Sequence, residues 1–323
     1  MTQLLILTNS SDGTCDILLE LFKSRNVPFF RWNIDLWQHY EIIYSERSIS
    51  IADPVGRVVD ISNPDLYLLW RKPFTEQMNF DRLPISADDQ SIARIQIIKW
   101  MQSVVATMLF ENRVRLVEPY ADQRLPKLFQ LQHAVNFFSV PQSLFSVQEN
   151  SNAFGASIIT KPLGNPSVGE ENIFYTRLVN GYDLLRPYPW FVQEALVGGV
   201  DITCVFINGN CHFYQCDYHR DEGSIDWRVE INTKNQSKWH FIDTSLSQKW
   251  ADCVRGYMLL IGLHYGRLDF IFHNERLYFL ECNSNGQFGW LDAADDMKLH
   301  NEFVNAVINP STSINFYNKK NHV

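Results

Sequence analysis

The sequence predicts a mixed α/β (α+β) protein made of consecutive domains without internal repeats. Its 323 residues exceed one ordinary compact domain, and 46% of them are hydrophobic, enough for a sizeable core. Strand and helix patterns alternate at the start, short strands fill the middle, and a hairpin flanked by helices follows. We therefore expect an N-terminal open α/β domain at residues 1–120, a small central β-rich domain at 121–196 and a C-terminal domain at 197–323.

A strand–helix–strand pattern opens the N-terminal domain, as is usual for an open α/β sheet. The apolar runs Leu4–Thr8 and Pro28–Trp32 are predicted strands, and Cys15–Lys23 between them is a predicted helix. Tyr67–Trp70 is expected to be another buried strand, and a strong helical period covers Ala87–Phe110.

The central domain begins with a helix and continues as short strands. The helix starts at Leu125 and its pattern breaks at Pro141. The expected strands are Ser157–Lys161, Ile173–Arg177 and Trp190–Glu194.

The C-terminal domain is predicted to contain two strands, a helix, a hairpin and a closing helix. In chain order these are Asp201–Ile207, Cys211–Asp217, Thr244–Gly262, Gly266–Asn283 and Asp295–Ile308.

Composition excludes several classes of function. A formal net charge of −8 disfavours a nucleic acid partner, which needs a surplus of Lys and Arg. No apolar run approaches the length of a membrane span, and the first residues lack the features of a signal peptide. The six cysteines show no C-x-x-C spacing, so reduced structural thiols and a cytoplasmic protein are expected.

The hairpin carries the most informative pattern. If its turn has three residues, around Asn274–Arg276, Asp269 lies directly opposite Glu281. Asn283 and Arg267 then project from the same face as this carboxylate pair, because side chains alternate along a strand. A slip of one residue would break the arrangement.

Oxygen ligands on rigid strands suit Mg²⁺, and a guanidinium suits a phosphate oxygen. The alternative is the exposed polar face of a hairpin with two solvated sides. Against it, the ligand-type residues share one parity while Leu268, Phe270 and Phe272 occupy the other. The pattern therefore favours a metal site.

At this hairpin the chain resembles the ATP-grasp superfamily, in which one strand provides an acid and the next provides E-x-N. The resemblance implies Mg²⁺ ligation by Asp269, Glu281 and Asn283. It also implies ATP as cofactor, with Lys127 and Lys161 reaching its phosphates. The three domains would then be a pre-ATP-grasp domain and two domains that clamp ATP. The loop Gly164–Gly169 of the central domain would be a lid over the phosphates.

The segment WFVQEAL is similar to the linker whose backbone reads adenine in this superfamily, and Asp201 falls where a ribose-binding acid is expected. The implied ATP-binding linker residues are Gln193, Glu194, Ala195 and Leu196. Many relatives have D-x-R after this linker, whereas this chain has Thr203 in place of the Arg. Arg228 or Arg220 would then substitute for this Arg, and Arg228 is the one expected to join Arg267 as a catalytic cation.

A narrower resemblance is to graspetide (microviridin-type) peptide ligases. LLWRKPF, IDWR and ECNSNGQFGWL look like segments of these enzymes. Such ligases phosphorylate Asp or Glu side chains of a ribosomally made precursor peptide, with leader and core, and form ester or amide macrocycles. Arg71 and Lys72, which end a predicted strand, and His219 are candidates for contacts with the substrate. A solvated strand end is the equal alternative for Arg71 and Lys72.

Two alternatives stay open at this point. One is an ATP-grasp ligase that joins free amino acids or glutamate. The other is a catalytically weak ATP-binding module with a regulatory role. The oligomeric state is also open, with a homodimer as one alternative.

Overall fold

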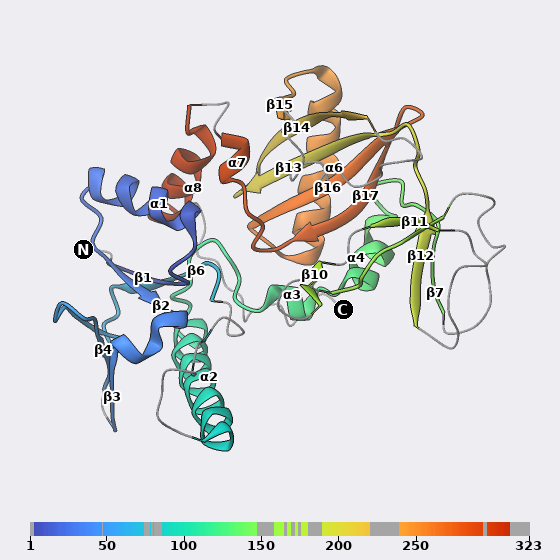
Figure 1. The fold of residues 1–323 in the computed structure, drawn as a ribbon. Coiled ribbons are helices and arrows are strands. Elements are labelled where there is room, and N and C mark those ends of the chain that lie inside the picture. The colour runs from blue at the N-terminus through green and yellow to red at the C-terminus, as the bar shows by residue number, and fades with distance from the viewer. Residues whose placement is uncertain are drawn as a thin grey trace. The chain divides into compact units, whose positions relative to one another are not determined.

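The computed structural model describes most of the chain as two compact units (Figure 1). Unit 1 comprises Met1–Tyr120, Leu263–Tyr265 and Gln287–Val323, and unit 2 comprises Ala121–Gly262 and Gly266–Gly286. The residues described are 3–46, 48–73, 78, 80, 86–146, 158–164, 167–168, 172–173, 176–179, 189–219, 239–292 and 296–310.

Unit 1 is built on a parallel sheet with strand order β2-β1-β6. The strands are β1 (Gln3–Thr8), β2 (Phe29–Asn33) and β6 (Leu66–Trp70), so the predicted open α/β pattern is confirmed. The strand order reverses at β1, and ligands of open α/β sheets bind beside the carboxyl ends of strands at such a point.

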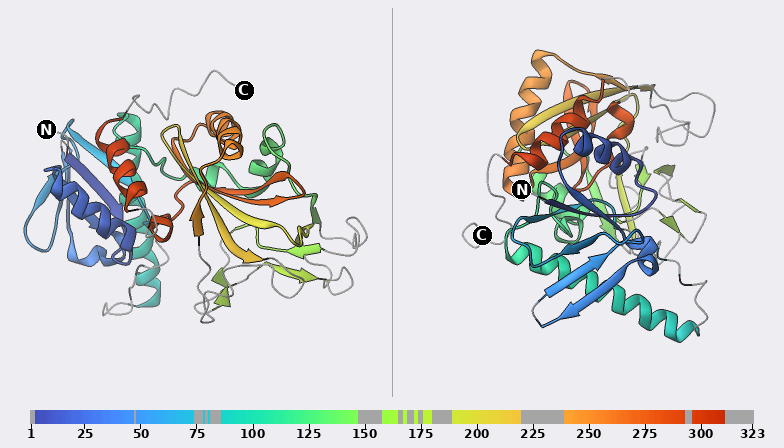
Figure 2. Two further views of the ribbon diagram at one scale, coloured as in Figure 1. Left: turned by 90° about the horizontal axis from the view of Figure 1, so that it is seen from above. Right: turned by 90° about the vertical axis from the view of Figure 1, so that its left-hand side faces the viewer.

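Helices cover the parallel sheet of unit 1 on two sides (Figures 1 and 2). The helices α1 (Gly13–Ser24) and α8 (Lys298–Ile308) contact each other, and α2 (Ala87–Phe110) contacts β6. Asp12 caps α1, because its side chain accepts a hydrogen bond from the Cys15 backbone.

The remaining parts of unit 1 are short, and the sequence did not predict its second sheet. The other elements are η1 (Ile34–His39), α7 (Gly289–Asp292) and an antiparallel sheet of β3 (Glu41–Ser45), β4 (Ser48–Ala52) and β5 (Val58–Asp60).

Unit 2 contains an antiparallel sheet with strand order β11-β8-β12-β7. Its strands are β7 (Ser143–Ser146), β8 (Ile158–Thr160), β11 (Arg177–Val179) and β12 (Trp190–Glu194). The prediction of one strand at Ile173–Arg177 is wrong. The chain forms two short strands there, β10 (Asn172–Ile173), which pairs with β9 (Ser167–Val168), and β11, which joins the larger sheet.

The second sheet of unit 2 has the order β15-β14-β13-β16-β17. Its strands are β13 (Val200–Ile207), β14 (Asn210–His219), β15 (Trp239–Phe241), β16 (Tyr265–His273) and β17 (Arg276–Asn283). The unit's helices are α3 (Ala121–Arg124), α4 (Lys127–Ala134) and α6 (Ser245–Ile261).

A capping residue at each end defines the limits of α6. The Thr244 hydroxyl accepts from the Ser247 backbone at the start, and Gly262 adopts a left-handed conformation with a φ of 67° at the end. All six cysteines are free thiols. No helix in the described part of the chain is long and apolar enough to cross a membrane.

Candidate functional site: a polar face on the β16–β17 hairpin

The hairpin register confirms the predicted pairing of Asp269 with Glu281, but not through the turn that was assumed. The turn has two residues, Asn274 and Glu275, both with positive φ, as a tight hairpin turn requires. A bulge at Leu280 then shifts the register between Asp269 and Phe270. The extra residue in the bulge replaces the extra residue expected in the turn, so the carboxylates still face each other.

Helix α6 covers the apolar face of this hairpin. The Cys282 thiol lies 3.9 Å from the Met258 sulfur, and the Tyr257 and Phe279 rings are 5.0 Å apart. Side chains of the opposite parity therefore point away from α6. The opposite parity includes Asp269 and Glu281, each partly exposed.

Asp269 is the centre of a hydrogen-bond cluster on the polar face. The Arg267 guanidinium donates to both of its oxygens, at 3.1 and 2.9 Å. The Asn283 amide donates at 3.1 Å, and the buried Thr203 hydroxyl of β13 donates at 2.9 Å. Side chains from three strands thus hold one carboxylate in place.

Glu281 forms an ion pair with a lysine from another element of unit 2. The Lys127 ammonium, at the start of α4, lies 2.8 Å from a Glu281 oxygen and donates to the Pro162 carbonyl at 3.2 Å. Burial alone would raise the pKa of Glu281, but Lys127, followed by Lys161 and Arg267, outweighs burial and lowers the pKa to about 2. Glu281 is therefore ionised at neutral pH.

Two residues of this site were not predicted as members from sequence. Gln130, buried in α4, donates to the Cys282 carbonyl at 3.0 Å and accepts from the Cys282 backbone N–H at 2.6 Å. It thereby fixes the backbone between Glu281 and Asn283. Thr203, noted only as a departure from D-x-R, instead hydrogen-bonds Asp269. The one available signal for Gln130 was a polar residue on the apolar side of a helix.

A glycine permits the chain to turn beside the cluster. A Cβ atom added at Gly286 would lie 2.6 Å from the Arg267 Cβ and 3.3 Å from the Asn283 Cβ. Glycine is therefore needed where the backbone leaves β17 and passes the polar face.

The predicted adenine linker lies at the end of β12. Gln193 is fully buried and its amide donates to the Ser143 hydroxyl at 2.8 Å. The Glu194 backbone N–H donates to the Gln142 carbonyl at 2.8 Å. Ala195 is half-buried and Leu196 is buried. Asp201 is buried on β13, beside an irregularity in its pairing with β14.

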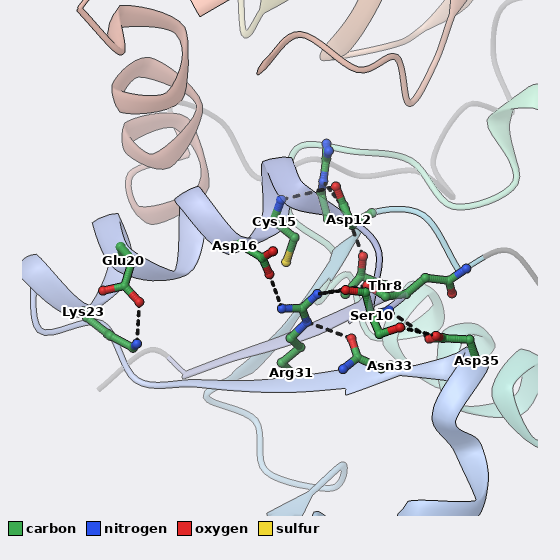
Figure 3. Close-up of polar contacts among 12 residues, drawn as sticks. Thr8, Ser10, Asp12, Cys15, Asp16, Glu20, Lys23, Arg31, Asn33 and Asp35 are labelled. Atoms are coloured by element: carbon green, nitrogen blue, oxygen red, sulfur yellow. Dashed lines mark hydrogen bonds and ion pairs between the residues drawn. The ribbon is translucent and has the colours of Figure 1, made fainter. Parts of the chain in front are cut away.

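The predicted substrate residue Arg71 lies in unit 1 and is fully buried, so it is not a solvated strand end. Its Nε is 3.4 Å from an oxygen of Asp12, which also accepts from the Thr8 hydroxyl at 2.9 Å. Burial would raise the pKa of Asp12, but Arg71 and the hydrogen bonds hold it below its usual range. Figure 3 shows Asp12 at the start of α1 with its Thr8 and Cys15 contacts.

The remaining predicted site residues are Lys72, His219 and Arg228. Lys72 is half-buried, and its charge also lowers the pKa of Asp12. The backbone of His219 ends β14 and pairs with Val200. Arg228, Arg220 and half of the predicted lid loop, 164–169, lie outside the described residues.

The polar face fits a magnesium nucleotide by the chemistry of its donors. Within the described residues no three His, Cys, Asp or Glu side chains form a metal-binding group. The hairpin instead provides two carboxylates and an amide, which suits Mg²⁺ because this ion keeps several waters and phosphate oxygens. The three cations around Glu281, namely Lys127, Lys161 and Arg267, exceed the two carboxylates in charge and suit a polyphosphate.

Comparison with solved structures supports the fold. A RiPP-associated ATP-grasp ligase from Chryseobacterium gregarium, in complex with ADP and a leader and core peptide, matches with a TM-score of 0.81 and 17% identity, over 97% of this chain and 98% of that one. The macrocyclase MdnC from Microcystis aeruginosa MRC, bound with precursor peptide MdnA, matches with a TM-score of 0.77 and 18% identity. This match covers 96% of this chain and 100% of MdnC.

A more distant match is the D-alanine–D-alanine ligase from Bacillus anthracis complexed with ATP. Its TM-score is 0.55 at 11% identity, over 95% of each chain. No protein-family model matches the sequence, and no curated protein matches it. The agreement over nearly the whole chain with three ligases of this architecture shows that the protein has the ATP-grasp fold.

Proposed function

We propose that this protein is an ATP- and Mg²⁺-dependent ligase that acts on a ribosomally made precursor peptide. It phosphorylates Asp or Glu side chains of the peptide, and a hydroxyl or amine then displaces phosphate to close an ester or amide ring. The reaction takes place in the cytoplasm, without a nucleic acid or membrane partner. The division into domains 1–120, 121–196 and 197–323 is part of this proposal.

The observation that carries the proposal is the convergence of opposite charges on the polar face of the hairpin. Asp269 and Glu281 lie side by side in register, and Asn283 bridges them with bonds of 3.1 and 3.4 Å. Lys127 reaches this pair from another element, and Arg267 reaches it from the same strand. Such a face can hold a divalent cation and phosphates together.

Each residue of the face has a role in the proposed reaction. Bound Mg²⁺·ATP supplies the phosphoryl group and lowers the repulsion between two anions. Asp269, Glu281 and Asn283 would hold the metal ion. The phosphates would be held by the cations Lys127, Lys161, Arg267 and Arg228, which stabilise developing charge.

The nucleotide base and sugar would be held by the end of β12, the linker after it and the start of β13. The adenine would lie against Gln193–Leu196, and Asp201 would bind the ribose. Gly199 supports this linker, because a Cβ there would lie 2.4 Å from the Ile271 side chain. A bulkier residue would push the linker away from β16.

Acidic side chains of the precursor would be bound by Lys72, which is half-buried, with His219 near the acceptor. Arg71 is fully buried and its charge is paired with Asp12, so a peptide cannot touch it in this conformation. Resemblance in fold to a ligase solved with a leader and core peptide, and to one solved with a precursor peptide, supports the same substrate class.

The two alternatives have weaker support. A ligase of free amino acids rests on the more distant match to D-alanine–D-alanine ligase. A weak ATP-binding module rests on Thr203 in place of Arg, but Thr203 hydrogen-bonds Asp269 at 2.9 Å and so keeps this carboxylate oriented.

Intact mass spectrometry tests the proposal. The protein is incubated with ATP, Mg²⁺ and short neighbouring gene products rich in Thr, Ser, Asp and Glu. We expect the peptide to lose one water per ring in the wild type and in the control Asp252→Asn, an exposed acid of α6, and no water in Glu281→Gln. ADP release only with free amino acids would establish the small-molecule ligase, and ATP binding without turnover would establish the non-catalytic module.

A further inference from the structure

Two cysteines of the β13–β14 hairpin form a close pair beneath helix α6. Cys204 on β13 pairs with Phe213, and Cys211 on β14 pairs with Phe206, so the two cysteines are diagonal neighbours on one face of the sheet. The Cys211 thiol donates to the Ala251 carbonyl of α6 at 3.7 Å, which identifies this face as the one that the helix covers. Figure 1 shows α6 against this sheet.

The side chains of the two cysteines are in hydrogen-bond contact. Burial raises the pKa of the Cys204 thiol, and the hydrogen bond and charge of Cys211 raise it further, so Cys204 is a protonated thiol at neutral pH. The other two cysteines of the sheet are less suitable partners for Cys204. Cys282 lies on β17 with β16 between, a separation of about 9–10 Å that exceeds the reach of a disulfide. Cys216 has the opposite parity to Cys211 on β14 and so points to the other face.

Solvent reaches one member of this pair. Cys211 lines a cavity of about 330 Å³ between β14, β15 and α6, whereas Cys204 is fully buried. A water molecule needs roughly 10–15 Å³ of such space, so the cavity also admits a molecule as small as hydrogen peroxide. An oxidant of this size can therefore meet Cys211 directly, and it can affect Cys204 through Cys211.

We propose that Cys204 and Cys211 are a dithiol pair that hydrogen peroxide oxidises reversibly to a disulfide. The Cys211 sulfur attacks one peroxide oxygen and the O–O bond breaks, which leaves a sulfenic acid on Cys211 and releases the second oxygen as water. The Cys204 sulfur then displaces the hydroxyl group from the sulfenic sulfur, and this group leaves with the Cys204 thiol proton as a second water. The two thiols lose two hydrogens in total, and the peroxide is reduced to two waters.

The position of the pair suits reversible oxidation. Diagonal neighbours on antiparallel strands have Cα atoms about 7–8 Å apart, somewhat beyond the usual span of a disulfide. The bridge must therefore draw β13 and β14 together, and a disulfide strained in this way is readily reduced. The inference is independent of the proposed ligase reaction.

Peptide mapping of the full chain tests the inference. The folded protein is treated with hydrogen peroxide, the remaining thiols are alkylated after denaturation, and chymotrypsin cleaves after Phe206 and Phe213, which puts Cys204, Cys211 and Cys216 on separate peptides. We expect the Cys204 and Cys211 peptides to be linked by a disulfide that dithiothreitol breaks. Complete alkylation of Cys204 after oxidation, or a disulfide from Cys204 to another cysteine, would overturn the proposal.

Two variants check which cysteine meets the oxidant. In Cys211→Ser we expect Cys204 to be alkylated to the same extent with and without peroxide, because a buried thiol has lost its route to the oxidant. Cys253→Ser is the matched control, since Cys253 of α6 is half-buried like Cys211, and it should form the linked peptides as the wild type does. Far-UV circular dichroism checks that both variants are folded. Oxidation of Cys204 that persists in Cys211→Ser, or loss of the bridge in Cys253→Ser, would also contradict the assignment.

Discussion

Gln130 is expected to hold the metal-binding strand in place, and its replacement should have a measurable cost. Its amide nitrogen donates to the Leu125 carbonyl at 2.8 Å and to the Cys282 carbonyl at 3.0 Å, and its oxygen accepts from the Cys282 N–H at 2.6 Å. Gln130→Leu keeps a similar volume but removes all three bonds. The Cys282 N–H and carbonyl then lose their partner beside a buried side chain.

The magnitude follows from the number of groups left without a partner. Each buried polar group that loses its hydrogen bond costs about 1–3 kcal/mol. Relaxation of the strand end recovers part of this, so we expect a loss of about 2–5 kcal/mol in the free energy of unfolding, a large share of the roughly 5–15 kcal/mol that is usual for a native protein.

Equilibrium urea unfolding measures this loss, with Gln132→Leu as the matched control. Gln132 lies on the same helix but is exposed, so its replacement should change the free energy of unfolding by less than about 0.5 kcal/mol. Hydrogen exchange should also show lower protection of the Cys282 amide in Gln130→Leu alone. Equal stability of the two variants would refute the role of Gln130.

Two further predictions concern residues that contact the polar face of the hairpin. Gly286→Ala brings a Cβ to 2.6 Å from the Arg267 Cβ and should lower the free energy of unfolding, measured by urea denaturation, by about 1–3 kcal/mol. The control is Gly164→Ala, since a Cβ at Gly164 would meet nothing within 4 Å. Equal losses of stability in the two variants would contradict the contact with Arg267. Lys127→Met removes a cation from Glu281, so the carboxyl pKa should rise from about 2 in an NMR titration, and an unchanged pKa would contradict the ion pair. Because the folded-state pKa is lowered, the ion pair stabilises the fold above the unfolded pKa of about 4.3, and the difference between wild type and variant should shrink as pH falls toward 2.

The sequence predicted the elements with strong periodicity and the pairing of the carboxylates. The helix Ala87–Phe110 was predicted with its observed ends, because a long apolar period marks it. The pairing of Asp269 with Glu281 was also right, although it combines a shorter turn with a bulge at Leu280. Alternation of side chains constrains the pairing near the site but does not say where an extra residue lies.

Other features could not be predicted because they depend on contacts between distant segments. Nothing local distinguishes Arg71 from a solvated strand end, and its burial follows from the pairing with Asp12 on another loop. Thr203 acquires its role only when β13 lies beside β16 and its hydroxyl meets Asp269. The short strands β3, β4 and β5 carry weak alternation, and tertiary packing decides their conformation.

Calorimetric titration with ATP, in the presence and absence of Mg²⁺, tests the central claim that the polar face of the hairpin is the site of the magnesium nucleotide. We predict that Mg²⁺ strengthens ATP binding to the wild type and to the control Asp252→Asn. In Asp269→Asn and Glu281→Gln the binding of Mg²⁺·ATP should be weaker by at least about 10-fold, because a metal ligand has lost its charge. Binding of Mg²⁺·ATP to both site variants as tight as to the wild type would contradict the assignment of this face.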